Sequence, residues 1–211
     1  MKKKESILLV LVIVFAVVPL WILPWFESMA VSEKSGTMYG LLYPLYQLLF
    51  VAAAFIVLCM MIKTLNEERM DRFLIWLLPL VLCFACLFTG VHSRQKIRMQ
   101  GMAAAAERSQ NLIAAIEQFE CDEGQPPRNL SELVPAYLPE IPGTGMQAYP
   151  AFEYYVGDIA RERYVGNHWV LRVFTPQLLM SLDELFYLPR QNYAEYGASV
   201  ERVGDWAYLH E

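Results

Sequence analysis

Hydrophobic positions are concentrated in the first 91 residues of the chain. Three apolar stretches, residues 7–26, 38–62 and 73–91, contain no Asp, Glu, Lys or Arg. A bilayer core about 30 Å thick is crossed by roughly 20 helical residues, and each stretch is near that length. The pattern therefore predicts three transmembrane helices, which form a membrane domain over residues 1–92.

The first stretch has a second interpretation as a signal peptide. Lys2, Lys3 and Lys4 form a basic start, and residues 28–30 (Ser-Met-Ala) loosely resemble a cleavage site. The apolar part of a signal peptide spans about 7–15 residues, and this stretch is longer. An uncleaved anchor is therefore favoured, with cleavage as the alternative.

Beyond residue 92 the pattern changes to that of a water-exposed domain. Residues 93–121 predict a long helix that follows the third stretch without a Pro or Gly cluster between them, and Gly124 ends it. One face of this helix carries a small and apolar stripe made of Ala105, Ser109, Leu112, Ile116 and Phe119. Asn129 and Glu132 resemble a capping box for a short helix over residues 130–134, which Pro135 stops.

The remaining residues have the alternation typical of β-strands. Strands are predicted at residues 151–156, 169–174 and 185–188, and residues 201–209 close the chain with Val203, Trp206 and Tyr208 as apolar members. Gly166-Asn167 predicts a turn that pairs residues 162–165 with 169–174 as a hairpin, with Arg161, Glu162 and Arg163 as turn charges. Residues 93–211 therefore predict an α+β domain in which a long helix packs on a small antiparallel sheet.

Three segments of this domain resemble a known family. They are residues 112–119 (Leu-Ile-Ala-Ala-Ile-Glu-Gln-Phe), 122–127 (Asp-Glu-Gly-Gln-Pro-Pro) and 130–142, which contains Leu-Val-Pro-Ala-Tyr-Leu-Pro. Together they resemble the soluble domain of pseudopilins, most closely the major pseudopilin of type II secretion. The resemblance implies a pilin-like head, with Tyr137 and Leu138 pinning a proline-rich loop to the core.

The membrane part departs from that family. Prepilins carry a Gly before the apolar segment and a Glu at its fifth mature position. This chain has Met70-Asp-Arg-Phe73 before its third stretch, no acid within it and two apolar stretches ahead of it. The head is therefore expected to be fixed permanently to a three-span anchor, without processing and polymerisation.

The distribution of basic residues predicts the orientation in a bacterial inner membrane. Short cytoplasmic loops are rich in Lys and Arg. Basic residues lie before the first stretch (Lys2, Lys3 and Lys4) and between the second and third stretches (Lys63, Arg69 and Arg72). Lys34 is the only basic residue between positions 27 and 37. The N-terminus is therefore predicted to be cytoplasmic and the α+β domain periplasmic. Arg94, Lys96 and Arg98 weaken this prediction without reversing it.

Charge and chemistry limit the function of the exported part. Residues 107–211 contain seven basic and sixteen acidic residues, a net charge of −9, which argues against nucleic acid or an anionic membrane surface as a partner. No catalytic, cofactor-binding or metal-binding residue is predicted. His92, His168 and His210 lack ligand spacing, and Glu117 and Glu120 are interpreted as a solvated helix face. Cys83 and Cys86 are interpreted as packing residues, and Cys121 has an intermolecular disulfide as a minority alternative.

The predicted function is therefore non-enzymatic. The head is an interaction module for a protein partner or a second copy, with the lipid bilayer around its anchor and no small-molecule ligand. Aromatic residues of a type expected on a surface support this: Tyr149, Tyr154, Tyr155, Tyr164, Tyr187, Tyr193 and Tyr196. The alternative is a component of a membrane transport or secretion system, or a membrane enzyme with a site near His92, Tyr39 and Gln47 at the membrane face.

Overall fold

The computed structural model describes residues 3–33, 39–67, 70–176 and 182–210. These residues form two compact units. The first comprises residues 1–30 and 34–98, and the second comprises residues 31–33 and 99–211. The division falls inside one helix, so both units contain part of the same element.

The first unit is helical, as the apolar pattern predicts. Its helices are α1 (Lys3–Val17), α2 (Pro19–Ala30), α3 (Tyr39–Asn66) and the first part of α4 (Met70–Arg108). Within the described residues, three helical segments are long and apolar enough to cross a membrane: Ser6–Ala30, Leu48–Asn66 and Phe73–Glu123. They overlap the three predicted stretches, so the prediction of three long apolar helices is confirmed.

Apolar side chains on these helices are exposed to a degree unusual for a water-soluble protein. Trp21 is 73% exposed and Phe88 is 78% exposed, for example. Water-soluble proteins rarely present large contiguous apolar surfaces, whereas a helix in a bilayer meets lipid tails as apolar as its own side chains. The exposed apolar surface is therefore that of a membrane protein.

The predicted stripe is the buried face of the helix in the second unit. After α4 ends, α5 (Gln110–Glu123) continues it. Ala105, Ser109, Leu112 and Ile116 are fully buried, and Phe119 packs against the same core. Gly124 ends the helix in the left-handed conformation, with a φ of 73°, and its N–H donates to the Glu120 carbonyl. Glycine adopts this conformation without a Cβ clash, which is why it stops the helix here.

The loop after the helix packs as expected. The short 3₁₀ helix η1 (Leu130–Leu133) begins at Asn129, whose side chain accepts a hydrogen bond from the Ser131 N–H. Leu138 joins the core, and the Tyr137 ring packs on Phe119 with centroids 5.4 Å apart. The proline-rich segment is therefore held against the helix.

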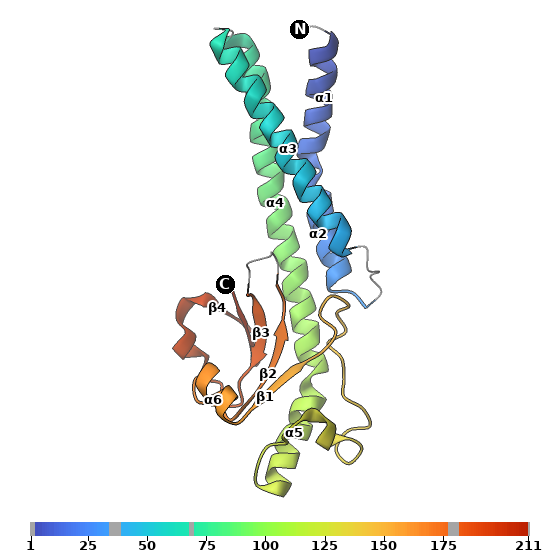
Figure 1. Ribbon diagram of the computed structural model, residues 1–211, viewed down its shortest axis with the longest axis vertical. Helices are drawn as coiled ribbons and strands as arrows, with labels where there is room; N and C mark the ends of the chain where they lie inside the picture. Colours follow the sequence, from blue (N-terminus) through green and yellow to red (C-terminus); the bar gives the residue numbers. More distant parts are fainter. Residues whose placement is uncertain (1–2, 34–38, 68–69, 177–181, 211) are drawn as a thin grey trace. The chain divides into compact units, whose positions relative to one another are not determined.

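The second unit also contains an antiparallel sheet. Its strands among the described residues are β1 (Glu153–Val156), β2 (Trp169–Phe174), β3 (Glu184–Tyr187), β4 (Val200–Val203) and β5 (Trp206–Leu209). They lie in the order β1-β2-β3-β5-β4. Figure 1 shows β1, β2 and β3 side by side. The predicted strands at 151–156, 169–174 and 185–188 are confirmed, and residues 201–209 are two strands joined by a tight turn.

The predicted hairpin between residues 162–165 and 169–174 is wrong. Residues 158–163 form the helix α6 (Asp158–Arg163), and β2 pairs with β1, Val156 opposite Trp169. The Gly157 N–H donates to the His168 carbonyl and closes this wider connection. A short helix is favoured because Ala160 packs into a core beneath it, so Arg161, Glu162 and Arg163 are helix residues.

Both faces of the sheet are covered. On one face Trp169, Leu171 and Val173 pack with the helix stripe. On the other face a second core contains Val170, Phe186 and Ala207, together with residues of α6 and of the 3₁₀ segment η2 (Tyr193–Ser199). The sequence predicted one buried face and did not identify this second core.

The two cores together correct the interpretation of the tyrosines. Tyr149, Tyr164, Tyr187 and Tyr193 are buried, and Tyr154, Tyr155 and Tyr196 are partly buried. These side chains fill the interior because their rings supply large apolar areas. The Tyr193 hydroxyl donates to the Asp205 carbonyl at 2.8 Å, whereas the Tyr196 hydroxyl has no hydrogen-bond partner among the described residues. They do not form an exposed aromatic surface.

Candidate functional site

A buried cluster of charged side chains lies in the first unit. The Glu27 side chain is fully buried, and its two carboxylate oxygens accept hydrogen bonds from Arg94 Nε at 2.8 Å and Arg98 Nη1 at 2.9 Å. Arg94 and Arg98 are four residues apart on α4, so they lie on the same face of that helix. One carboxylate from α2 thus binds two guanidinium groups from α4.

This cluster places three charged side chains in the interior of the first unit. Burial of an isolated charge in an apolar setting is costly, and pairing with hydrogen bonds offsets that cost. Glu27 lies within the segment Ser6–Ala30, which is apolar enough to cross a membrane. Ionisable residues in such segments mark functional positions by default. The cluster was not predicted from the sequence, because Glu27 directly follows the apolar stretch and its two partners lie far from it along the chain.

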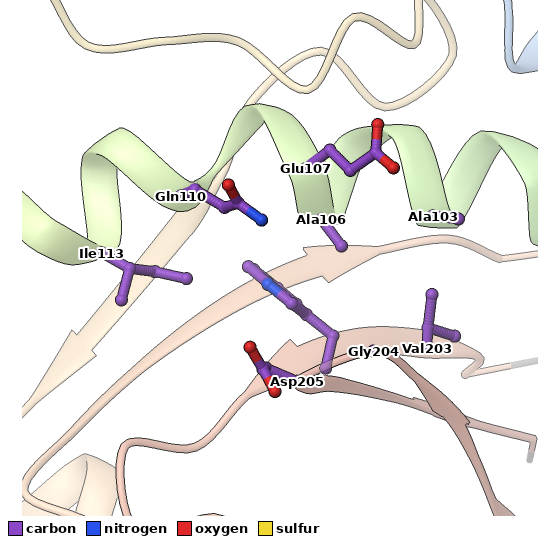
Figure 2. Close-up of a pocket in the computed structure, with 9 residues that line it drawn as sticks. Ala103, Ala106, Glu107, Gln110, Ile113, Val203, Gly204 and Asp205 are labelled. Carbon is purple, nitrogen blue, oxygen red and sulfur yellow. The ribbon is translucent and has the colours of Figure 1, made fainter.

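A cleft lies in the second unit, between the long helix and the turn that joins β4 to β5. Its volume is about 290 Å³. Figure 2 shows Ala103, Ala106, Glu107, Gln110 and Ile113 along the helix, and Val203, Gly204 and Asp205 on the strand end and turn that face them. Trp206 is the ninth lining residue. Helix and turn, which are far apart in the sequence, therefore form two walls of one cleft.

The cleft combines an apolar lining with polar groups. Glu107, Gln110 and Asp205 are exposed, whereas Trp206 is 1% exposed. The Trp206 Nε1–H is buried and has no hydrogen-bond partner among the described residues. A buried indole N–H ordinarily has a partner.

Hydrogen bonds hold the turn of the cleft in place. The Asp205 carbonyl accepts from the Tyr193 hydroxyl at 2.8 Å and from Gln191 Nε2 at 3.1 Å. The carboxylate of Asp205 also acts on its surroundings. Burial is the main cause that raises the pKa of Tyr187, and the negative charges of Glu117 and Asp205 raise it further. Arg202 brings a positive charge to the same turn, since its Nη2 donates a hydrogen bond to the Gly204 carbonyl at 3.0 Å.

Glu120 differs from its sequence interpretation. Its Oε1 lies 2.8 Å from His168 Nε2, and its Oε2 accepts a hydrogen bond from Trp169 Nε1 at 3.3 Å. The prediction of a solvated face is wrong for this residue, whereas Glu117 is exposed. The contacts tie the end of α5 to the start of β2, so they are structural links between the helix and the sheet.

The other residues weighed from the sequence are dispersed. His92 is exposed on α4, and His210 lies 3.4 Å from Glu201 at the end of the chain. Cys83 and Cys86 lie in α4, and all four cysteines (Cys59, Cys83, Cys86 and Cys121) are free thiols. The side chains of Tyr39, Tyr43 and Gln47 lie outside the described residues. In the described part of the chain, no group of three His, Cys, Asp or Glu residues could hold a metal ion.

No family model, no curated protein and no solved structure matches the sequence. The resemblance to pseudopilins rests on residues 112–142 and stays a prediction.

Proposed function

We propose that this chain is a non-enzymatic protein of the bacterial inner membrane that presents a pilin-like α+β domain on the periplasmic side. The domain contacts other envelope proteins or further copies of the chain. The observation that carries this proposal is that α4 is shared by the two units. The helix begins with an apolar span and goes on to supply core residues of the domain.

The shared helix attaches the domain to the membrane without a linker. Met102 and Ala105 lie on α4, and both are fully buried in the core of the second unit. A domain whose core includes residues of a helix that begins with an apolar span stays at the membrane and meets partners there, which favours a role in contact or assembly.

Crosslinking in intact cells tests this function. A photo-reactive amino acid is placed at Gln110 in the cleft, and separately at Glu162, which is exposed on α6. We expect discrete adducts of higher mass at Gln110 and few at Glu162. If the protein inserts normally and neither position captures a partner or a second copy, the proposal is wrong.

A second candidate function is a component of a membrane transport or secretion system. The buried Glu27 cluster favours it, because Glu27 lies at the end of the apolar segment Ser6–Ala30, and ionisable residues in such segments often mark ion or substrate paths. This candidate predicts that the Glu27→Gln variant fails to complement a deletion strain even when its expression is raised until its membrane level matches that of the parent protein. Full complementation by the variant would remove the candidate.

A further inference from the structure

We infer that residues 31–33 form a strap that couples the first apolar helix segment to a loop of the α+β domain. These three residues follow the end of α2 at Ala30 and belong to the second unit, whereas residues 34–98 belong again to the first. The strap is therefore joined at both ends to segments of the first unit. Its contacts lie within the chain and are independent of the proposed contact function.

Val31 is the apolar contact of the strap. Its side chain is partly buried and packs against the core between the long helix and the sheet. The helix has Gly101 at the point of contact, where a Cβ would lie 2.5 Å from the Val31 Cβ. Carbon atoms in contact are ordinarily about 3.5–4.0 Å apart. The strap can therefore approach the helix this closely only because residue 101 lacks a side chain.

Ser32 and Glu33 supply the polar contacts of the strap. The Ser32 carbonyl accepts a hydrogen bond from the Gln147 N–H at 3.0 Å. Glu33 lies 3.2 Å from Arg108, whose Nη1 donates to the Thr144 carbonyl at 3.0 Å. The ion pair is exposed and contributes little by itself. Both contacts lead to one loop, so the strap and that loop hold each other in place.

The loop of residues 144–149 leads on to the sheet. The Tyr149 hydroxyl donates to the Pro176 carbonyl at 3.3 Å, just beyond the end of β2. Backbone amides exchange with solvent when the local contacts around them open. Gln147 is exposed, and its N–H donates to the strap. The exchange rate of this amide therefore reports whether the strap is in place.

The strap begins one helical turn after the buried charge cluster. Glu27 lies four residues before Val31, and α2 is helical as far as Ala30. The Glu27 carboxylate is bound by Arg94 and Arg98 on α4. A helical turn moves as one piece, because its backbone hydrogen bonds fix the rise per residue. Loosening of the charge cluster therefore displaces the strap and frees the loop that it holds.

Hydrogen exchange followed by mass spectrometry on the full chain in detergent micelles tests the strap. Gly101→Ala adds a Cβ that overlaps Val31, and Val31→Ser removes the apolar contact. We expect the loop of residues 144–149 to exchange about ten-fold faster in each variant, while β2 exchanges as in the parent. Alanine is the better helix former, so faster exchange in Gly101→Ala comes from the lost strap contact.

Gln100→Ala is the matched control for the strap variants, since Gln100 is exposed on the same helix. It should leave the exchange of the loop unchanged. Loop exchange equal to that of the parent in both Gly101→Ala and Val31→Ser would overturn the inference.

Glu27→Gln tests the coupling to the first unit. We expect the loop to exchange about three- to ten-fold faster in this variant, with β2 again unchanged. Glu67→Gln, which alters an exposed carboxylate of the first unit, should leave the loop as in the parent. Loop exchange at the parent rate in Glu27→Gln, or equal acceleration of the loop and β2, would overturn the inference.

The intact mass of the purified protein is a second measurement. A strap that acts between two membrane helices requires that residues 1–30 are retained, so we expect a mass that includes them. A mass that lacks this segment would remove the upstream end of the strap and contradict the inference.

Discussion

Ile116 lies on the apolar stripe of the helix and is fully buried in the core between the helix and the sheet. Leu112 and Leu171 belong to the same core. Truncation of such a side chain removes buried apolar area and leaves a cavity, because the rigid surroundings relax only in part.

We expect Ile116→Ala to lower the free energy of unfolding by about 2–5 kcal/mol. Asn111→Ala on the same helix is the control, since Asn111 is exposed and surface changes alter stability by about 0.5 kcal/mol or less. Denaturant unfolding in mixed micelles, followed by tryptophan fluorescence, measures both variants. Similar losses for the two would show that the stripe does not face the core.

The buried tyrosines make stability depend on alkaline pH. Burial is the largest cause that raises the pKa of Tyr196 to about 12, and Glu184 and Glu195 add to it. Burial likewise raises the pKa of Tyr164 and Tyr193. In the unfolded chain a tyrosine loses its proton near pH 10. Above that pH the unfolded state binds fewer protons than the native state, so stability falls as pH rises.

The expected result is a falling melting temperature from about pH 10 upward, with little change between about pH 8 and pH 9.5. Tyrosinate absorbance of the native protein should lag behind that of the chain in denaturant. Coincident titration curves near pH 10 would contradict the burial of these side chains.

At the scale of elements, two ion pairs offer a direct comparison. Glu27 and Arg98 are both fully buried, whereas Glu33 and Arg108, 3.2 Å apart, are 64% and 42% exposed. Removal of one partner from a buried pair is strongly destabilising, because it leaves charge in an apolar setting. An exposed pair is screened by water and contributes little.

Glu27→Gln should therefore lower the free energy of unfolding by about 3–5 kcal/mol. Glu33→Gln should lower it by about 1 kcal/mol or less. The same denaturant measurement in micelles compares the two variants. A loss for Glu27→Gln no larger than that for Glu33→Gln would mean that the α2–α4 charge cluster does not stabilise the first unit.

Much of the element pattern was predictable from the sequence. The apolar stretches, the buried stripe, the stop at Gly124 and the strand at Trp169–Phe174 all follow from local periodicity and turn chemistry. Gly166 does adopt the left-handed turn conformation that the sequence suggests, with a φ of 74°. The segment before this turn is the helix α6 and not a strand, so the predicted hairpin does not form. Strand pairing depends on contacts between distant residues, and no local pattern encodes them.

The candidate sites were less predictable than the elements. Nothing near Glu107 in the sequence indicates that Asp205 and Trp206 lie across a cleft from it. Glu27 was one residue beyond an apolar stretch. A buried partner for Arg94 and Arg98 becomes visible only when α2 and α4 are packed together.

At the scale of the whole molecule, one helix links an apolar span to an acidic domain. Residues 107–211 carry a net charge of −9. A strongly charged domain stays soluble and avoids anionic surfaces. The proposed contact function requires that this domain lie on the periplasmic side of the inner membrane.

A topology reporter tests that claim most directly. An enzyme that is active only in the periplasm is fused after Glu211, and a second enzyme that is active only in the cytoplasm is fused at the same point. We expect activity of the periplasmic reporter and none of the cytoplasmic one. Cytoplasmic activity with a silent periplasmic reporter would contradict it.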